Sequence, residues 1–143
     1  VSGVAGGLDG NTGASIMTLV GFGNTGTGGF AEALVYASDN GARISSNSWS
    51  YGSGGYVDQD ILDAIDYSYD EDTVIVFAAG NYNTDSPTYP AYYDKTIAVA
   101  AVDDNGGLAS FSNSSIVLLQ SPNPVSMSTI VGRSVTRDIC ELL

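Results

Sequence analysis

The sequence contains no histidine, and it has one cysteine, Cys140, among its 143 residues. Without histidine the chain lacks the usual general base of a Ser-His-Asp triad and the commonest metal ligand. A single cysteine excludes an internal disulfide and a thiolate metal cluster, so cysteine usage does not indicate a redox compartment. Any site in this chain must therefore be built from other side chains.

Basic residues are also scarce, because 4 Lys and Arg stand against 16 Asp and Glu, a net charge of -12. Such a charge repels phosphate backbones and anionic membrane surfaces, which argues against a nucleic-acid partner. The acids are scattered among polar residues, as expected of a solvated surface that suits a secreted or salt-exposed protein. No apolar run approaches the roughly 18 residues that cross a bilayer, so no membrane partner is expected. Nothing in the sequence indicates an oligomeric state.

Hydrophobic residues make up 43% of the chain, enough for the core of one domain. Helical periodicity predicts helices over about 29–39 and 57–69, and the second places on one face Val57, Ile61, Leu62, Ile65 and Ser68 or Tyr69. Strand-like runs occupy 15–20, 44–49, 73–78 and 96–102. The consecutive apolar residues of 73–78 predict a central strand covered on both faces. This alternation predicts an α/β fold with a parallel sheet.

A glycine-rich loop, "GFGNTGTGGF", begins at Gly21 with the pattern G-x-G-x-x-G between a strand-like and a helix-like segment. That order raises the possibility of a dinucleotide site. Such a site needs an acidic residue at the end of the second strand, and no carboxylate appears there before Asp58. Glycines also continue through Gly28 and Gly29, so Gly26 does not fit inside a helix packed on the strand. We therefore interpret the loop as a flexible connection.

The residues that follow two predicted strands are the candidates for chemistry, because ligands of open α/β sheets bind beyond the carboxyl ends of the strands. Ser48-Trp49-Ser50 ends one strand and Ala78-Ala79-Gly80-Asn81 ends the next. A side-chain amide directly after a glycine can point into the crevice and stabilise a developing oxyanion. A simple turn at Gly80-Asn81 is the alternative interpretation.

Five motifs between Asn40 and Asn113 resemble, in order and spacing, the central part of a subtilisin-like serine peptidase. They are Asn47-Ser48-Trp49-Ser50, Ala79-Gly80-Asn81, Tyr89-Pro90-Ala91, the run from Ile97 to Val102, and Ala109-Ser110-Phe111-Ser112. More loosely, Val1 to Gly7 is similar to the segment that follows the family's His-Gly-Thr-His motif and begins a buried helix. The resemblance implies a parallel-sheet, three-layer αβα fold that is incomplete here.

The resemblance also implies peptide-bond hydrolysis, a polypeptide substrate and secretion. Asn81 corresponds to the oxyanion-hole amide of the family. Ser48, Trp49 and Ser50 would form one wall of the substrate cleft, and Ala78, Ala79 and Gly80 the other. The glycine-rich loop would then lie near this cleft. Calcium is common in the family, but no residue here is assigned to it and no cofactor is implied.

The triad itself has no counterpart in this sequence. We expect the Asp-Ser/Thr-Gly and His-Gly-Thr-His motifs before Val1, and the nucleophile motif Gly-Thr-Ser-Met-Ala beyond the tail. Ser126 is the nearest imitation of a nucleophile, but its flanking residues differ from the motif. A Ser/Lys pair using Lys95 would need a depressed lysine pKa, which a polar loop does not supply. The 143-residue chain alone is therefore predicted to be an inactive fragment.

Residues 1–113 are interpreted as the central part of the peptidase domain, and residues 114–143 as a divergent tail that could hold a strand at Ile116 to Leu119. The alternative function is that of a non-catalytic relative that keeps the cleft as a peptide-binding module.

Two acidic clusters, Asp58 to Asp66 and Asp103 to Gly107, lack the ligand spacing of an EF-hand. We interpret the first as a solvated helix face with acids near its N-terminus. No metal site is predicted.

Overall fold

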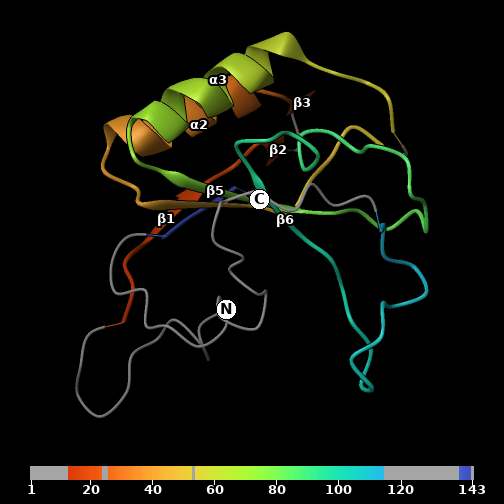
Figure 1. Cartoon of the computed structure of the whole chain (residues 1–143). Helices are drawn as coiled ribbons and strands as arrows, with labels where there is room; N and C mark the ends of the chain where they lie inside the picture. The colour runs from red at the N-terminus through yellow and green to blue at the C-terminus, as the bar shows by residue number, and fades with distance from the viewer. Residues whose placement is uncertain (1–12, 24–25, 53, 115–138, 143) are drawn as a thin grey trace.

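A parallel sheet organises the chain. The structure, a computed structural model, describes residues 13–23, 26–52, 54–114 and 139–142 (Figure 1). Five strands pair in the order β1-β7-β4-β5-β6, and every neighbouring pair is parallel. Their bounds are Ile16–Leu19 (β1), Ile44–Asn47 (β4), Val74–Ala78 (β5), Ile97–Val99 (β6) and Ile139–Leu142 (β7). The α/β prediction is confirmed, and β5 is a central strand as expected.

Two helices lie side by side on one face of this sheet: α2, Phe30–Asp39, and α3, Gln59–Asp70 (Figure 1). Both were predicted to within about two residues. The helix α2 begins after Gly29, whose φ of 70° is left-handed. The helix α3 begins at Asp58, whose side chain accepts a hydrogen bond from the Asp60 N–H at 3.2 Å. Among the described residues, neither helix has the length and apolarity that a membrane span requires.

The core lies between these helices and β5. Ile61 and Ile65 of α3, with Leu34 of α2, cover Ile75 and Phe77 of β5. The two helices are also joined by the buried Ser68 hydroxyl, which donates to the Leu34 carbonyl at 3.3 Å.

The predicted apolar face of the second helix is correct except at its ends. Ser68 is fully buried, whereas Tyr69 is 50% exposed. Of the two residues offered for the last position of this face, Ser68 is therefore the correct one. Val57 is 44% exposed, because it precedes the N-cap Asp58 and so does not follow the helical period.

The strand β5 is not covered on both faces within the described structure. Ile75 and Phe77 are buried beneath the helices, but Val74 is 45% exposed on the opposite side. This differs from the prediction because both described helices lie on the same face of the sheet (Figure 1). The predicted buried helix that would begin at Val1 to Gly7 lies outside the described residues.

The tail contributes a strand that was not predicted. The strand β7 lies between β1 and β4, in a register that places Cys140 between Met17 and Ser45. Its four residues, "ICEL", are too few to show a period. The predicted strand at Ile116 to Leu119 lies outside the described residues, and the domain boundary near Asn113 stays a prediction.

The strand β6 is shorter than its apolar run. The run 96–102 predicted seven residues, but β6 ends at Val99, and Val102 forms only an isolated antiparallel bridge with Leu108. Between them, one carboxylate oxygen of Asp103 accepts from the N–H groups of Asn105 and Gly107, each at 2.9 Å. The carboxylate of Asp103 therefore closes the predicted turn at 103–107.

A polar network fixes the segment before β6 to α3. The Tyr93 hydroxyl donates to the Asp66 carboxylate at 2.8 Å, and the Lys95 ammonium lies 3.1 Å from the same carboxylate. The hydrogen bond to Asp66 is the main cause that raises the pKa of Tyr93 to about 12. The pKa of Lys95 is also raised, again mainly through Asp66. The depressed pKa that a Ser/Lys pair would need is therefore not found at Lys95.

The raised pKa of Tyr93 predicts a loss of stability at high pH. The folded pKa of about 12 exceeds the unfolded value of about 10, so the neutral phenol stabilises the fold fully below about pH 10. This contribution is lost as the pH rises from about 10 to about 12. We expect Tyr93→Phe to make the fall in Tm over this range shallower, while Tyr36→Phe, a change at an exposed ring, leaves it unaltered. Equal slopes for Tyr93→Phe and the unmodified chain, measured by circular dichroism, would contradict this assignment.

Candidate functional site

The candidate site begins where β4 and β5 end side by side. The two strands pair in a register that sets Asn47 against Phe77, so the chain leaves both strands at the same edge of the sheet. Ser48 to Ser50 follow β4, and Ala79 to Asn81 follow β5. The carboxyl edge of a parallel sheet is the place where ligands of open α/β folds bind. The structure therefore brings the two predicted segments together.

A pocket of about 270 Å³ lies between these two segments. All but one of the predicted site residues line it: Ser48, Trp49, Ser50, Ala78, Gly80 and Asn81. Two residues that the sequence did not indicate, Phe22 and Tyr82, also line it. The exception is Ala79, which is 1% exposed. Its N–H donates to the Val99 carbonyl at 2.9 Å, so Ala79 anchors the segment to β6 instead of facing the pocket.

Trp49 is the most buried residue of the lining. Its ring is 7% exposed, stacks on Phe30 with 4.4 Å between centroids, and meets Phe77 edge-on at 5.1 Å. Its indole N–H donates to the side-chain oxygen of Asn47 at 3.3 Å. The amide of Asn47, itself 2% exposed, donates to the Ser45 hydroxyl and to the Val76 carbonyl. One wall of the pocket is thus continuous with the core.

The side-chain amide of Asn81 is available for binding. Asn81 is exposed, and no hydrogen bond within the described part of the chain engages its side chain. The preceding Gly80 has a φ of 109°, a conformation that glycine adopts most readily. None of the described residues that line the pocket is charged. An anionic oxygen placed there would meet amide and hydroxyl dipoles and no lining carboxylate.

The glycine-rich loop supplies Phe22 to this pocket. Phe22–Gly23 (β2) and Gly26–Thr27 (β3) pair as an antiparallel hairpin, and the Gly28 N–H donates to the Gly21 carbonyl at 3.1 Å. A dinucleotide loop leads directly from a strand into a helix, which this hairpin does not do. The loop therefore reaches the candidate pocket through Phe22, and its interpretation as a flexible connection near a substrate cleft stays a prediction. The pattern Gly-Phe-Gly did not itself reveal that Phe22 would face the pocket.

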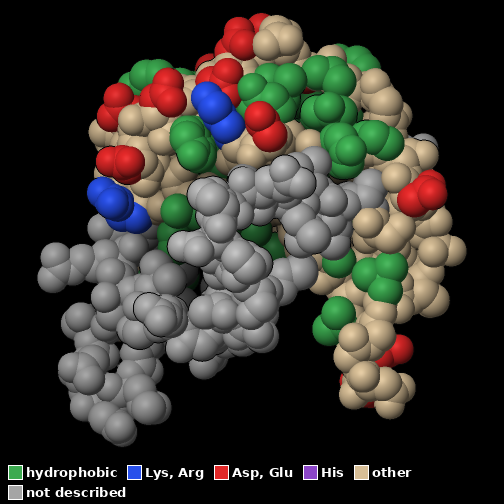
Figure 2. Space-filling model, in the orientation of Figure 1, with side chains coloured by type: hydrophobic (Ala, Val, Ile, Leu, Met, Phe, Trp, Pro, Cys, Tyr) green, Lys and Arg blue, Asp and Glu red, His purple; other side chains and the backbone are tan. Residues whose placement is uncertain are grey.

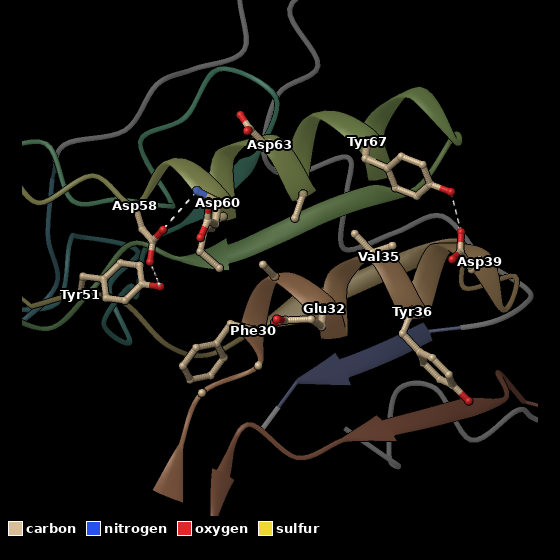
Figure 3. Close-up of a pocket in the computed structure, with 15 residues that line it drawn as sticks. Phe30, Glu32, Val35, Tyr36, Asp39, Tyr51, Asp58, Asp60, Asp63 and Tyr67 are labelled. Atoms are coloured by element: carbon tan, nitrogen blue, oxygen red, sulfur yellow. Dashed lines mark hydrogen bonds between the residues drawn. The ribbon is translucent and has the colours of Figure 1, made fainter.

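A larger groove of about 810 Å³ lies elsewhere, between α2 and α3 (Figure 3). Its rim is acidic, and two of its carboxylates are engaged by tyrosines: Tyr67 donates to Asp39 at 2.6 Å and Tyr51 donates to Asp58 at 2.9 Å. The hydrogen bond to Asp39 is the main cause of the raised pKa of Tyr67.

This groove is larger than the pocket at the strand ends, but no cluster of three potential metal ligands exists among the described residues. Figure 2 shows acidic side chains at several places on the visible face, so acidic residues are not confined to one site. We therefore place the candidate site at the strand ends, where an uncommitted amide lies in a pocket without charged lining.

Two other residues considered as catalytic groups do not contribute to the site. Ser126 lies outside the described residues. Lys95 is paired with Asp66 and Asp70, and it is not part of the pocket lining. No general base is therefore assigned in the described part of the chain.

Comparison with known proteins gives consistent matches. A family model described as the subtilase family matches residues 2–132. Thermitase from Thermoactinomyces vulgaris is 37% identical over 121 residues, covering 81% of this chain and 42% of thermitase. Fervidolysin from Fervidobacterium pennivorans is 36% identical over 134 residues, covering 84% of this chain and 19% of that protein.

Among solved structures, the prenylagaramide maturation protease PagA superposes with a TM-score of 0.58 at 26% identity, over 65% of this chain and 35% of that one. The chain therefore spans less than half the length of each of these relatives.

The network beneath the pocket wall yields a stability prediction. Replacing Asn47 with Ala leaves the buried Trp49 N–H without an acceptor, which we expect to lower the free energy of unfolding by about 1–3 kcal/mol. Asn81→Ala is the matched control, because an exposed amide without an internal partner changes stability by less than about 0.5 kcal/mol. Urea unfolding followed by the fluorescence of Trp49, the one tryptophan of the chain, measures both. The same urea midpoint for the two variants would contradict the role given to Asn47.

Proposed function

The chain belongs to the subtilase family, and we propose that it forms the substrate-cleft section of a subtilisin-like serine endopeptidase. The observation that carries this proposal is the pocket at the ends of β4 and β5, which contains the unengaged amide of Asn81. The fold supports it as well, because an incomplete subtilisin-like α/β fold is present. The partial coverage of thermitase supports the view that the chain is one section of a longer enzyme.

In the proposed reaction Asn81 supplies the side-chain donor of the oxyanion hole. When a serine attacks a peptide carbonyl, the carbonyl oxygen becomes negatively charged, and a donor already in position stabilises that charge. The exposed amide of Asn81 suits this role, since binding the oxygen breaks no internal hydrogen bond. The uncharged lining also suits it, because a neighbouring carboxylate would oppose the negative charge of the transition state.

The two walls of the pocket would hold the peptide. Ser48, Trp49 and Ser50 would form one wall and Ala78 and Gly80 the other, which the buried Ala79 anchors to β6, with backbone groups of both segments beside an extended chain. Phe22, Trp49 and Tyr82 give the pocket an aromatic lining without charge. An apolar or aromatic substrate side chain fits such a lining best.

The chain alone lacks the remaining catalytic groups. It has no histidine, so no Ser-His-Asp triad forms within it. A peptide would therefore bind to the chain without being cleaved. The alternative function, a stand-alone peptide-binding module, would show the same behaviour. We propose secretion too, because the family resemblance implies it and the acidic surface in Figure 2 suits that setting.

We predict that the purified 143-residue chain does not hydrolyse a chromogenic peptide such as a Phe p-nitroanilide. The physical reason is the missing histidine, without which no base accepts the serine proton. Release of p-nitroaniline is measured by absorbance, with serine-protease inhibitors added to control for contaminants. Activity that persists in the pure chain and disappears in Asn81→Ala would contradict the prediction of an inactive chain.

We also predict that the chain binds N-acetyl-Ala-Ala-Pro-Phe-amide with one site, detected as a saturable change in Trp49 fluorescence. Ser50→Phe should abolish this change, because a phenyl ring would fill the pocket that Ser50 lines. Ser110→Phe adds the same ring at an exposed position outside the lining and should leave binding intact. Equal affinities for the two variants would exclude this pocket as the peptide site.

A further inference from the structure

Asn113 is a buried side chain whose hydrogen bonds converge on the turn that carries Asn81. It is 0% exposed, and it lies more than 30 positions along the chain from that turn. Its side-chain nitrogen donates to the Ala79 carbonyl at 2.9 Å, and its side-chain oxygen accepts from the Tyr82 N–H at 2.8 Å. Its backbone N–H donates to the Gly80 carbonyl at 3.0 Å. One residue thus bonds to the backbone on both sides of Asn81.

The turn depends on this residue because the sheet no longer supports it. The strand β5 ends at Ala78, and the last bond toward β6 is the one from the Ala79 N–H to Val99. Beyond that point the carbonyls of Ala79 and Gly80 and the N–H of Tyr82 all find their partner in Asn113. Because the side chain of Asn81 has no internal partner, its direction is set by the backbone that Asn113 holds.

A carboxamide is the group that meets these requirements. The side chain must donate to Ala79 and accept from Tyr82 at the same time, which a carboxylate or an apolar group of the same size does not do. The fit is also close, since a Cβ added at Gly80 would collide with the side-chain nitrogen of Asn113. The position of the Asn113 side chain therefore requires a glycine at position 80.

We call the hydrogen bonds from Asn113 to the turn 79–82 the Asn113 clamp. This clamp also reaches Thr88, in the loop that precedes Tyr89-Pro90. The side-chain nitrogen of Asn113 also donates to the Thr88 hydroxyl at 3.1 Å. Asn113 itself is fixed in place by its neighbours, because the Ser112 hydroxyl accepts from the Ala101 N–H and the Ser114 N–H donates to the Thr84 carbonyl. Residues 112–114 thus join the segment 79–88 to Ala101.

We propose that Asn113 is the positioning residue of the oxyanion site, holding the turn 79–82 so that the Asn81 amide faces the bound peptide carbonyl. This inference rests on the function proposed above. Asn113 does not touch the substrate and acts only through the turn.

The test compares Asn113→Ala with Thr73→Val in the complete 143-residue chain. Thr73 is likewise buried, and its hydroxyl donates to the Ala42 carbonyl next to the opposite end of β5, so its loss costs stability without touching the turn. The readout is the NMR signal of the Asn81 side-chain amide, assigned by its absence in Asn81→Ala. The probe is N-acetyl-Ala-Ala-Pro-Phe-amide.

In the unmodified chain and in Thr73→Val we expect the peptide to shift the Asn81 amide signal saturably. In Asn113→Ala we expect that shift to fall to less than about half and the Kd to rise about tenfold, the loss expected when a buried hydrogen-bonded network is broken. A response of Asn113→Ala equal to that of Thr73→Val would overturn the positioning role and leave Asn113 as a structural residue. Absence of the shift in the unmodified chain would instead overturn the proposed function, and the positioning role with it.

A measurement on the unmodified chain keeps the proposal falsifiable if Asn113→Ala does not fold. The clamp requires that the Asn113 side-chain amide and the Tyr82 N–H exchange with solvent at least about tenfold more slowly than the exposed Asn81 side-chain amide. Equal exchange rates for Asn113 and Asn81 would overturn the proposal.

Discussion

The pairing of β4 with β5 is the constraint on which the rest of the site depends. Parallel strands that are neighbours end at the same edge of the sheet, and the register from Ile44–Val74 to Asn47–Phe77 makes the two strands end together. The segments that leave these ends are therefore forced into proximity. A slip of one residue in this register would turn the side chains of one strand to the opposite face and remove Phe77 from beneath Trp49.

Two buried side-chain amides hold in place the segments that form the pocket. Asn47 fixes Trp49 from the β4 side, and Asn113 contacts the turn beyond β5 from the other. Asn47 bonds the Trp49 indole and the Val76 carbonyl, and Asn113 bonds backbone groups of the turn beyond β5. No buried side-chain polar atom lacks a partner in the described part of the chain. A fully satisfied polar network of this kind rigidifies its surroundings. The pocket of this strongly acidic protein is itself lined by uncharged residues, which keeps the site suited to a developing negative charge.

The helices, most strands and the two segments of the candidate site could be predicted from the sequence. Hydrophobic periods and the residues that follow each strand depend only on neighbours in the sequence. The apolar run of β5 and the period of α3 identified the core, and the order of the motifs brought Trp49 and Asn81 to one place. Coverage of β5 on both faces is not seen among the described residues, where Val74 is 45% exposed because both described helices lie on one face of the sheet. Phe22 and Asn113 were missed as parts of the site, since each reaches it through tertiary contacts that no local pattern encodes. The strand β7 was missed because four residues show no period.

The central claim is that this chain is the cleft-forming section of a larger peptidase. Sequencing the coding locus on both sides, with all three frames read downstream of Asn113, tests it most directly. The account predicts an Asp-Ser/Thr-Gly and a His-Gly-Thr-His motif upstream and a Gly-Thr-Ser-Met-Ala motif downstream. Clean start and stop codons with none of these motifs would contradict it and would identify a stand-alone relative whose function is peptide binding.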